Sequence, residues 1–248
     1  MTRRIPRARI KPGLAIRKIR LSQILVFMVL LACAGTGAVL TAVVFDRLVT
    51  LGDFRGVVLV AVAIFALYLY AILIFRLFLR AFPLRAGEIA EGSQQEFVYH
   101  VYVLFFLMLF YSIMRSGFMP APLMRLFYLA IGARLGANTY TQGIIHDPRF
   151  VEIGDNSVVG QYALLIPHVI EGRRLAHYPI RIGHNVTIGA GATVLAGVVV
   201  GDGAIVSTGA VVTKETLIGD GEIWGGIPAR LLGRTSGLLP SRESPPLT

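Results

Sequence analysis

The chain has 248 residues, of which 55% are apolar and 15% charged, and its mean hydropathy is +0.69. An ordinary soluble domain carries about 25% charged residues, so this composition indicates membrane-embedded segments and excludes a disordered chain, while the single cysteine excludes a disulfide scaffold. The net charge is +10, but residues 1–20 supply eight of these charges without an aromatic-rich basic face, which excludes a nucleic-acid partner.

The N-terminal segments predict a basic cytoplasmic tail, residues 1–20, followed by a two-helix transmembrane hairpin over residues 21–80. Residues 21–45 carry no charge, and a helix of this length reaches about 37 Å, enough to cross a hydrocarbon core of about 30 Å. A second charge-free run, 56–75, ends at arginines. With cations before the first run and after the second, the positive-inside rule places both ends of the hairpin in the cytoplasm.

Residues 81–130 contain a third apolar run, 97–114, which is rich in aromatic residues. This run is at the lower limit of length for a membrane span. It either crosses the membrane or lies at the surface as an interfacial or re-entrant helix.

From about residue 131, aliphatic residues recur at every sixth position. Counting from residue 182, seven successive positions are β-branched: Ile182, Ile188, Val194, Val200, Val206, Val212 and Ile218. Each hexad forms a short strand and a turn, and such units must stack because none can bury its apolar side alone. Counting back from Leu165 places Asp147 in an aliphatic position, one coil below. The register breaks once, within residues 166–180, and a single polar loop interrupting a packed repeat indicates function.

The pattern resembles the hexapeptide-repeat acyltransferases over residues 135–230. Its motifs are an Asp seven residues before the Gly of an Ile-Gly-Asp-Asn hexad, a His in the register break, Val-Val-Thr-Lys at 211–214 and Gly-Ile-Pro-Ala-Arg at 226–230. Their order is similar to the sugar and antibiotic O-acetyltransferase branch. The resemblance implies an all-β left-handed parallel β-helix over residues 131–233, preceded here by transmembrane α-helices. Residues 234–248 are expected to form a flexible C-terminal tail.

Acyl transfer from a thioester needs a base for the attacking hydroxyl or amine. An imidazole in the register break is the natural base, so we expect His168 to take this role, with His177 in the same loop as the alternative. The resemblance implies that Asp147 orients the base, and Glu171 is a second candidate for orienting it or replacing Asp147.

The donor is expected to be acetyl-CoA or another acyl-CoA. The resemblance implies that Lys214 and Arg230 bind its phosphates and that the turns at Ala190 and Thr208 meet its pantetheine arm. We expect no metal: a β-helical zinc enzyme needs three converging histidines, and the spacing of His168, His177 and His184 does not match that pattern.

These features predict a multi-pass protein of the inner (cytoplasmic) membrane with a cytoplasmic acyltransferase domain, in contact with membrane lipids. The acceptor would be a small molecule or an envelope-related lipid-linked glycan or peptide, and the resemblance implies a homotrimer. Because acyl-CoA is cytosolic, an even number of crossings is required, which assigns residues 97–114 to the membrane interface. The alternatives are a non-catalytic membrane-anchored β-helical scaffold and a metal-dependent β-helix enzyme.

Overall fold

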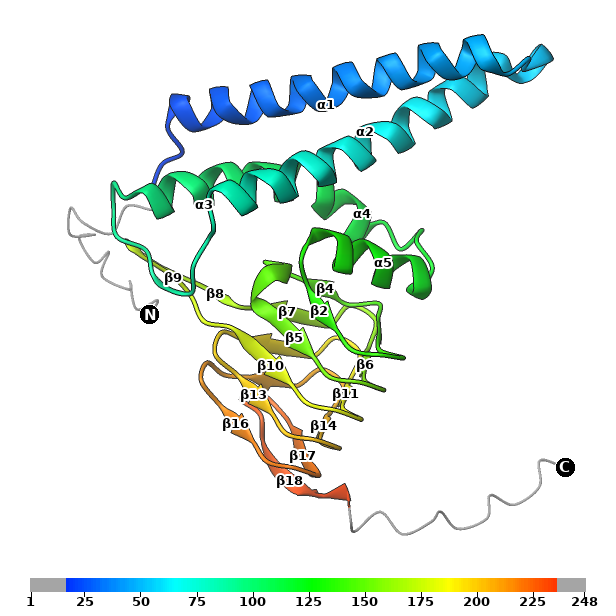
Figure 1. Ribbon diagram of the computed structural model, residues 1–248. Coiled ribbons are helices and arrows are strands. Elements are labelled where there is room, and N and C mark those ends of the chain that lie inside the picture. Colours follow the sequence, from blue (N-terminus) through cyan, green and yellow to red (C-terminus); the bar gives the residue numbers. More distant parts are fainter. Residues whose placement is uncertain (1–16, 236–248) are drawn as a thin grey trace, which may run out of the picture.

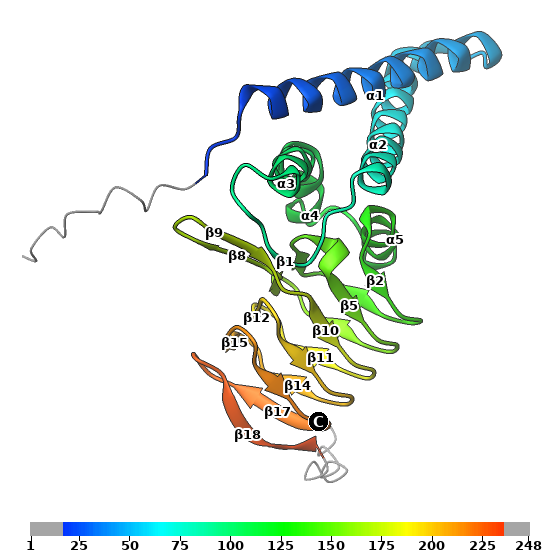
Figure 2. The same ribbon diagram turned by 60° about the vertical axis from the view of Figure 1, so that its left-hand side comes forward.

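The computed structural model describes residues 17–235 and consists of a helical half followed by a β-helix (Figure 1). Two long helices form an antiparallel pair, a third lies beneath them, and the β-helix stacks away from all three (Figures 1 and 2). The helices are α1 (Leu21–Leu48), the 3-10 helix η1 (Gly52–Phe54), α2 (Arg55–Ala81), α3 (Gln94–Phe105), the π-helix η2 (Phe106–Phe110), α4 (Tyr111–Arg115) and α5 (Ala121–Ile131).

The α1–α2 pair covers the region predicted to form the transmembrane hairpin. Both helices extend beyond the charge-free runs because their charged ends continue the helical backbone. A small residue allows close packing between them: a Cβ atom at Gly37 would lie 3.0 Å from the ring of Tyr70. One turn further along α1, Thr41 Oγ1 lies 3.1 Å from the Tyr70 hydroxyl.

Three helical segments are long and apolar enough to cross a membrane: Leu21–Leu48, Gly52–Ala81 and Gln94–Arg115. They differ in burial, because 17% and 11% of the apolar window is buried in the first two and 50% in the third. The third segment is packed between the α1–α2 pair and the β-helix (Figure 2). Two of its buried polar residues are paired, since Glu96 Oε1 accepts a hydrogen bond from Arg17 Nη1 at 3.2 Å and His100 Nδ1 lies 3.1 Å from Gln23 Oε1.

The β-helix consists of three parallel sheets joined at three corners. The first sheet contains β2 (Arg134–Leu135), β5 (Val151–Ile153), β10 (Ile180–Ile182), β13 (Val199–Val200) and β16 (Leu217–Ile218). The second contains β3 (Tyr140–Thr141), β6 (Val158–Val159), β11 (Thr187–Ile188), β14 (Ile205–Val206), β17 (Glu222–Gly225) and the antiparallel β18 (Arg230–Arg234). The third contains β4 (Ile144–Ile145), β7 (Leu164–Ile166), β12 (Thr193–Leu195) and β15 (Val211–Val212). The stacked hexads predicted from the sequence are confirmed.

The coils stack closely because their aliphatic residues point inward and glycines line the corners. Val194 and Val212 pair between neighbouring coils, three hexads apart in sequence, and both are fully buried. A Cβ atom at Gly189 would lie 2.4 Å from the backbone nitrogen of Thr208, closer than any real side chain can approach. Glycine is therefore required at this corner.

The register break is an ordered insertion, which corrects the predicted polar loop. Ile153 pairs with Ile182, whereas Ile182 pairs with Val200 in the next coil, so the coil that begins at Ile153 is much longer than the regular coil above it. The added chain forms an antiparallel hairpin of β8 (His168–Glu171) and β9 (Arg174–His177), and β1 (Gly87–Glu88) adds a third strand beside β9. Within this small sheet β9 is paired on both sides, and β8 is the edge strand.

The predicted position of Asp147 in the repeat is wrong. Ile145, not Asp147, pairs with Leu165 and points into the core. The step from Thr141 to Ile145 is shorter than a regular hexad, and the step from Ile145 to Ile153 is longer. Asp147 lies at the corner within this longer step with a φ of 43°, directly before the 3-10 helix η3 (Pro148–Phe150).

Candidate active site

The structure brings Asp147 and His168 together at the corner between the third and first sheets. His168 Nδ1 lies 2.5 Å from Asp147 Oδ2, and Asp147 is 3% exposed. Because a carboxylate only accepts hydrogen bonds, Nδ1–H donates, and Nε2 is left with a lone pair. The side chain of His168 remains 24% exposed, so this base is held in one tautomer at the edge of the fold.

Each partner shifts the ionisation of the other. Burial opposes the charge on Asp147 most strongly, but the hydrogen bond from His168 and the nearby imidazoles outweigh it, so the pKa of Asp147 is lowered. Burial likewise disfavours charged His168, yet the hydrogen bond to Asp147 and its negative charge outweigh this effect and raise the pKa of His168. Asp147 therefore stabilises the imidazolium that a general base forms.

His177, the alternative base, lies opposite His168 in the hairpin but is completely buried. Its ring stacks on Phe150 at 4.4 Å and meets Tyr99 edge-on at 5.2 Å. Neither ring nitrogen has a hydrogen-bond partner among the residues that the structure describes. Burial lowers the pKa of His177 and favours the neutral ring. This enclosure leaves His177 no direct access to an acceptor and favours His168.

The third helical segment, Gln94–Arg115, covers this site. The sequence analysis did not predict this contact. Tyr99 of α3 contacts His177, and Phe106 of the π-helix lies 5.7 Å from the ring of His146. His146 in turn lies 5.8 Å from the ring of His168, with its pKa lowered by burial. The position of His146 directly before Asp147 was the available signal for this residue. π-Helical turns occur frequently at functional sites.

Glu171 lies at the tip of the hairpin, away from the Asp147–His168 pair. Its carboxylate accepts hydrogen bonds from Lys214 and, at 3.3 Å, from Arg174 Nη1. The hydrogen bond from Lys214 is the main cause of its lowered pKa. The structure thus corrects the expectation that Glu171 orients His168 or replaces Asp147: β8 points it toward solvent and these cations.

The residues expected to bind the donor do not gather at one place within a single chain. Ala190 and Thr208 lie at the corner between the second and third sheets, one directly above the other. Lys214 lies at the corner that carries the hairpin, while Arg230 begins β18 and is exposed.

No group of three or more His, Cys, Asp and Glu residues arranged to hold a metal ion occurs within residues 17–235. His184 lies at the corner between the first and second sheets, where its Nδ1 accepts a hydrogen bond from the backbone nitrogen of Asp155 at 2.9 Å. It does not converge with His168 and His177.

Comparison with known proteins supports the repeat. The family model described as the hexapeptide repeat of succinyl-transferase matches residues 179–214. Residues 179–214 therefore carry a hexapeptide repeat. This match includes the stretch from β10 to the turn after β15, the most regular coils of the β-helix. The predicted resemblance is confirmed over residues 179–214, and the predicted fold class is confirmed as a parallel β-helix that follows long apolar helices.

Several solved structures are similar to part of the chain. A hexapeptide-repeat-containing acetyltransferase from Vibrio cholerae, complexed with acetyl coenzyme A, is 26% identical over 42% of this chain and 60% of that chain, with a TM-score of 0.38. A maltose O-acetyltransferase from Clostridium difficile has the same identity and coverage and a TM-score of 0.39. A galactoside acetyltransferase in complex with coenzyme A is 22% identical over 52% of this chain and 78% of that chain, with a TM-score of 0.41. The match therefore spans about 60% of the length of the first two structures. No curated protein matches the chain.

Proposed function

We propose that the protein is a membrane-anchored acyltransferase that transfers an acetyl or other acyl group from acyl-CoA to a hydroxyl or amine of an envelope-related acceptor. The observation that carries this proposal is the buried Asp147 hydrogen-bonded to a partly exposed His168, at a corner of a hexapeptide-repeat β-helix. This arrangement provides an oriented base, and a repeat that served only as a scaffold would have no need of one.

In the proposed reaction, Nε2 of His168 takes the proton from the acceptor hydroxyl or amine as its oxygen or nitrogen attacks the thioester carbonyl carbon. The new carbon–oxygen or carbon–nitrogen bond forms and the carbon–sulfur bond breaks. The departing CoA thiolate takes the proton from His168, which returns to its neutral state. Asp147 holds the ring and stabilises its transient positive charge.

The proposed donor site lies between subunits of a homotrimer. Ala190 and Thr208 lie at one corner of the β-helix and the hairpin with His168 at another. In a three-fold arrangement, the corner with Ala190 and Thr208 in one subunit can face the corner with the hairpin in its neighbour. Lys214 and Arg230 would then bind the phosphates of CoA, with Lys214 exchanging Glu171 for the donor.

The proposed topology places α1 and α2 across the inner membrane and the β-helix in the cytoplasm, with residues 1–20 as a basic cytoplasmic tail. The exposed apolar side chains along α1 and α2 support this, because they have no other partner in the described residues. The third segment, within residues 81–130, is proposed to lie at the interface, as its greater burial and its contacts with the histidines favour. The predicted tail, residues 234–248, falls outside the described residues except at its start.

The test is transfer from radiolabelled acetyl-CoA in membranes that contain the protein. Wild-type protein should label a lipid, glycan or soluble fraction, and His168→Ala should lower the rate by about 10²–10⁴-fold, the typical contribution of a general base. His184→Ala is the matched control, since His184 lies at a different corner. Equal labelling by wild type and His168→Ala would reject the proposal in favour of a scaffold.

A further inference from the structure

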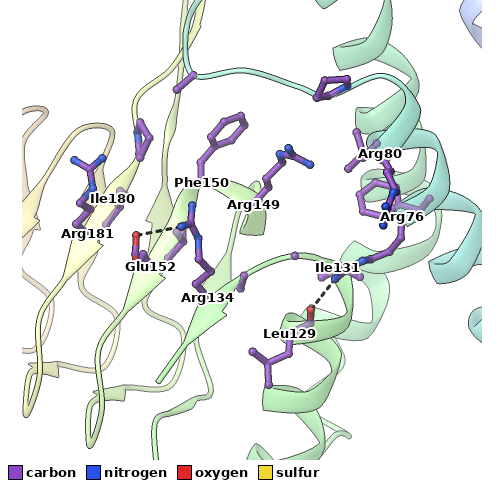
Figure 3. Close-up of a pocket in the computed structure, with 18 of the residues that line it drawn as sticks. Arg76, Arg80, Leu129, Ile131, Arg134, Arg149, Phe150, Glu152, Ile180 and Arg181 are labelled. Atoms are coloured by element: carbon purple, nitrogen blue, oxygen red, sulfur yellow. Dashed lines mark hydrogen bonds and ion pairs between the residues drawn. The ribbon is translucent and has the colours of Figure 1, made fainter. Parts of the chain in front are cut away.

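A second feature, distinct from the Asp147–His168 pair, is a cavity of about 850 Å³ between the helical half and the β-helix. It lies between the ends of α2 and α5 and the strands of the first sheet (Figure 3). Small-molecule sites have volumes of about 300–1,000 Å³, so the cavity can hold a ligand. Neither Asp147 nor His168 lines it.

The wall of the cavity is strongly basic. Figure 3 shows cations on two facing walls, with Arg76 and Arg80 on α2 and Arg149 on the side of the β-helix. Five arginines line the cavity: Arg76, Arg80, Arg134, Arg149 and Arg181. The single carboxylate among the lining residues is that of Glu152. The guanidinium groups match a phosphate well, because each can donate two parallel hydrogen bonds to its oxygens.

Most of this charge is not neutralised by the protein. Arg134 lies 3.8 Å from Glu152, and both side chains are at least half exposed, so this pair is weak. Within residues 17–235, no carboxylate lies within ion-pair distance of Arg80, Arg149 or Arg181. Repulsion among these cations is relieved when an anion binds between them.

One arginine is fixed in place by backbone contacts. Arg76 Nη1 donates to the carbonyl oxygens of Leu129 and Ala130, at 3.2 Å and 3.1 Å, at the end of α5. These contacts orient the guanidinium at the cavity wall before any ligand arrives, which lowers the entropic cost of binding.

The position of the cavity on α2 indicates which phosphate it receives. The same end of α2 contributes apolar residues to the wall: Phe75, Leu77 and Leu79. Arg76 and Arg80 close the charge-free run, where the positive-inside rule places the cytoplasmic interface. A ligand that carries both a phosphate and an apolar chain fits this combination. We propose that the cavity binds the phosphate group of a membrane lipid headgroup, a proposal that rests on the membrane placement of α2 in the proposed function.

A bound headgroup would lie close to the candidate active site. Phe150 lines the cavity and also stacks on His177 at 4.4 Å. Arg149 precedes it on η3, which begins directly after Asp147. The ring of Phe150 therefore lies between the cavity and His177. A lipid bound in the cavity would keep the active site close to the membrane surface.

The test is binding of dioctanoyl phosphatidic acid to the purified full chain in detergent, measured by native mass spectrometry. Dioctanoylglycerol has the same chains without the phosphate, and inorganic phosphate lacks the chains. We expect phosphatidic acid to bind more tightly than either.

Arg80→Gln and Arg149→Gln should each weaken the binding of phosphatidic acid about tenfold, which corresponds to the loss of one charged hydrogen bond. Arg85→Gln is the matched control: this exposed arginine follows α2 and does not line the cavity, so its removal should leave binding unchanged.

Three results would overturn the proposal. If inorganic phosphate binds as tightly as the lipid, the site recognises a soluble phosphate. If dioctanoylglycerol binds as tightly, the phosphate is not recognised. If Arg85→Gln weakens binding as much as Arg80→Gln, the attraction is nonspecific. Because Arg80 is exposed, its replacement should not impair folding, so it decides the test even if Arg149→Gln is unstable. His168→Ala should retain lipid binding while losing transfer, which separates failure of this proposal from failure of the proposed function.

Discussion

The hydrogen bond between Asp147 and His168 couples the ionisation of the proposed base to a buried carboxylate. Because this partner raises the pKa of His168 above its ordinary value of 6.5, the base becomes neutral only above that pH. The rate of acyl transfer should therefore rise with pH, with the midpoint of the acid limb above 6.5. A pH profile of kcat/KM with acetyl-CoA measures this midpoint, and a midpoint below 6.5 would contradict the assignment.

Replacing Asp147 by Asn tests the partner directly. The amide cannot stabilise the imidazolium, and burial, which lowers the pKa of His168, then acts without opposition. We expect the acid limb of Asp147→Asn to move to lower pH and the maximal rate to fall about 10³–10⁴-fold, as for other oriented imidazole bases. Glu171→Gln is the control, because Glu171 contacts Lys214 and Arg174 instead of the histidine. A lower rate without any shift of the limb would show that Asp147 acts only on folding.

The sequence analysis singled out Asp147 and His168, which the structure places within hydrogen-bond distance of each other, but not the residues around them. His168 lies in the register break that is visible in the sequence, whereas the irregular step that holds Asp147 became visible only in the structure. Tyr99 and Phe106 become part of the site only because the third helical segment folds over a corner that is distant from it in sequence. Such contacts follow from tertiary packing between segments that carry no shared pattern.

Among the secondary-structure elements, the regular coils were the most predictable because their burial depends on a short period. The inserted hairpin was not predictable: the stretch from Leu165 to Ile182 fits a shortened set of three hexads as well as one hexad plus an insertion. The insertion is stabilised by the pairing of β1 with β9, which brings Gly87 beside His177. This contact joins segments that are distant in sequence, so the local spacing does not reveal it.

The tight corners predict a destabilising substitution. Gly189→Ala would place a methyl group 2.4 Å from the backbone nitrogen of Thr208, so the two coils must separate. Overpacking of this kind costs about 1–3 kcal/mol, and we expect the midpoint of thermal unfolding in detergent to fall by several degrees. Gly233→Ala is the control, because no atom lies within 4 Å of the added group. Equal midpoints for the two variants would argue against the close stacking at Thr208.

The packing of α1 against α2 predicts a second pair of variants. Gly37→Leu would force a bulky side chain into the ring of Tyr70, whereas the Cβ position at Gly35 has no atom within 4 Å. We expect Gly37→Leu to lower the thermal stability of the purified protein and Gly35→Leu to leave it unchanged. If both substitutions are equally harmless, the two helices do not pack through Gly37 in the membrane.

At the scale of the whole molecule, the membrane topology determines whether acyl-CoA can reach the proposed site. Acyl-CoA is cytosolic, so the β-helix must lie on the same side of the membrane as the basic tail, and the third helical segment must not cross.

Asp53 in η1, between α1 and α2, should then face the opposite side of the membrane from Glu215 in the β-helix. In a Cys33→Ala background, a membrane-impermeant maleimide added to intact cells, with access to the periplasm, should label Asp53→Cys, while Glu215→Cys should react only after lysis. Both positions are exposed, so burial does not account for a difference in labelling. Labelling of Glu215→Cys in intact cells would mean that Gln94–Arg115 crosses the membrane, which would separate His168 from acyl-CoA and refute the proposed reaction.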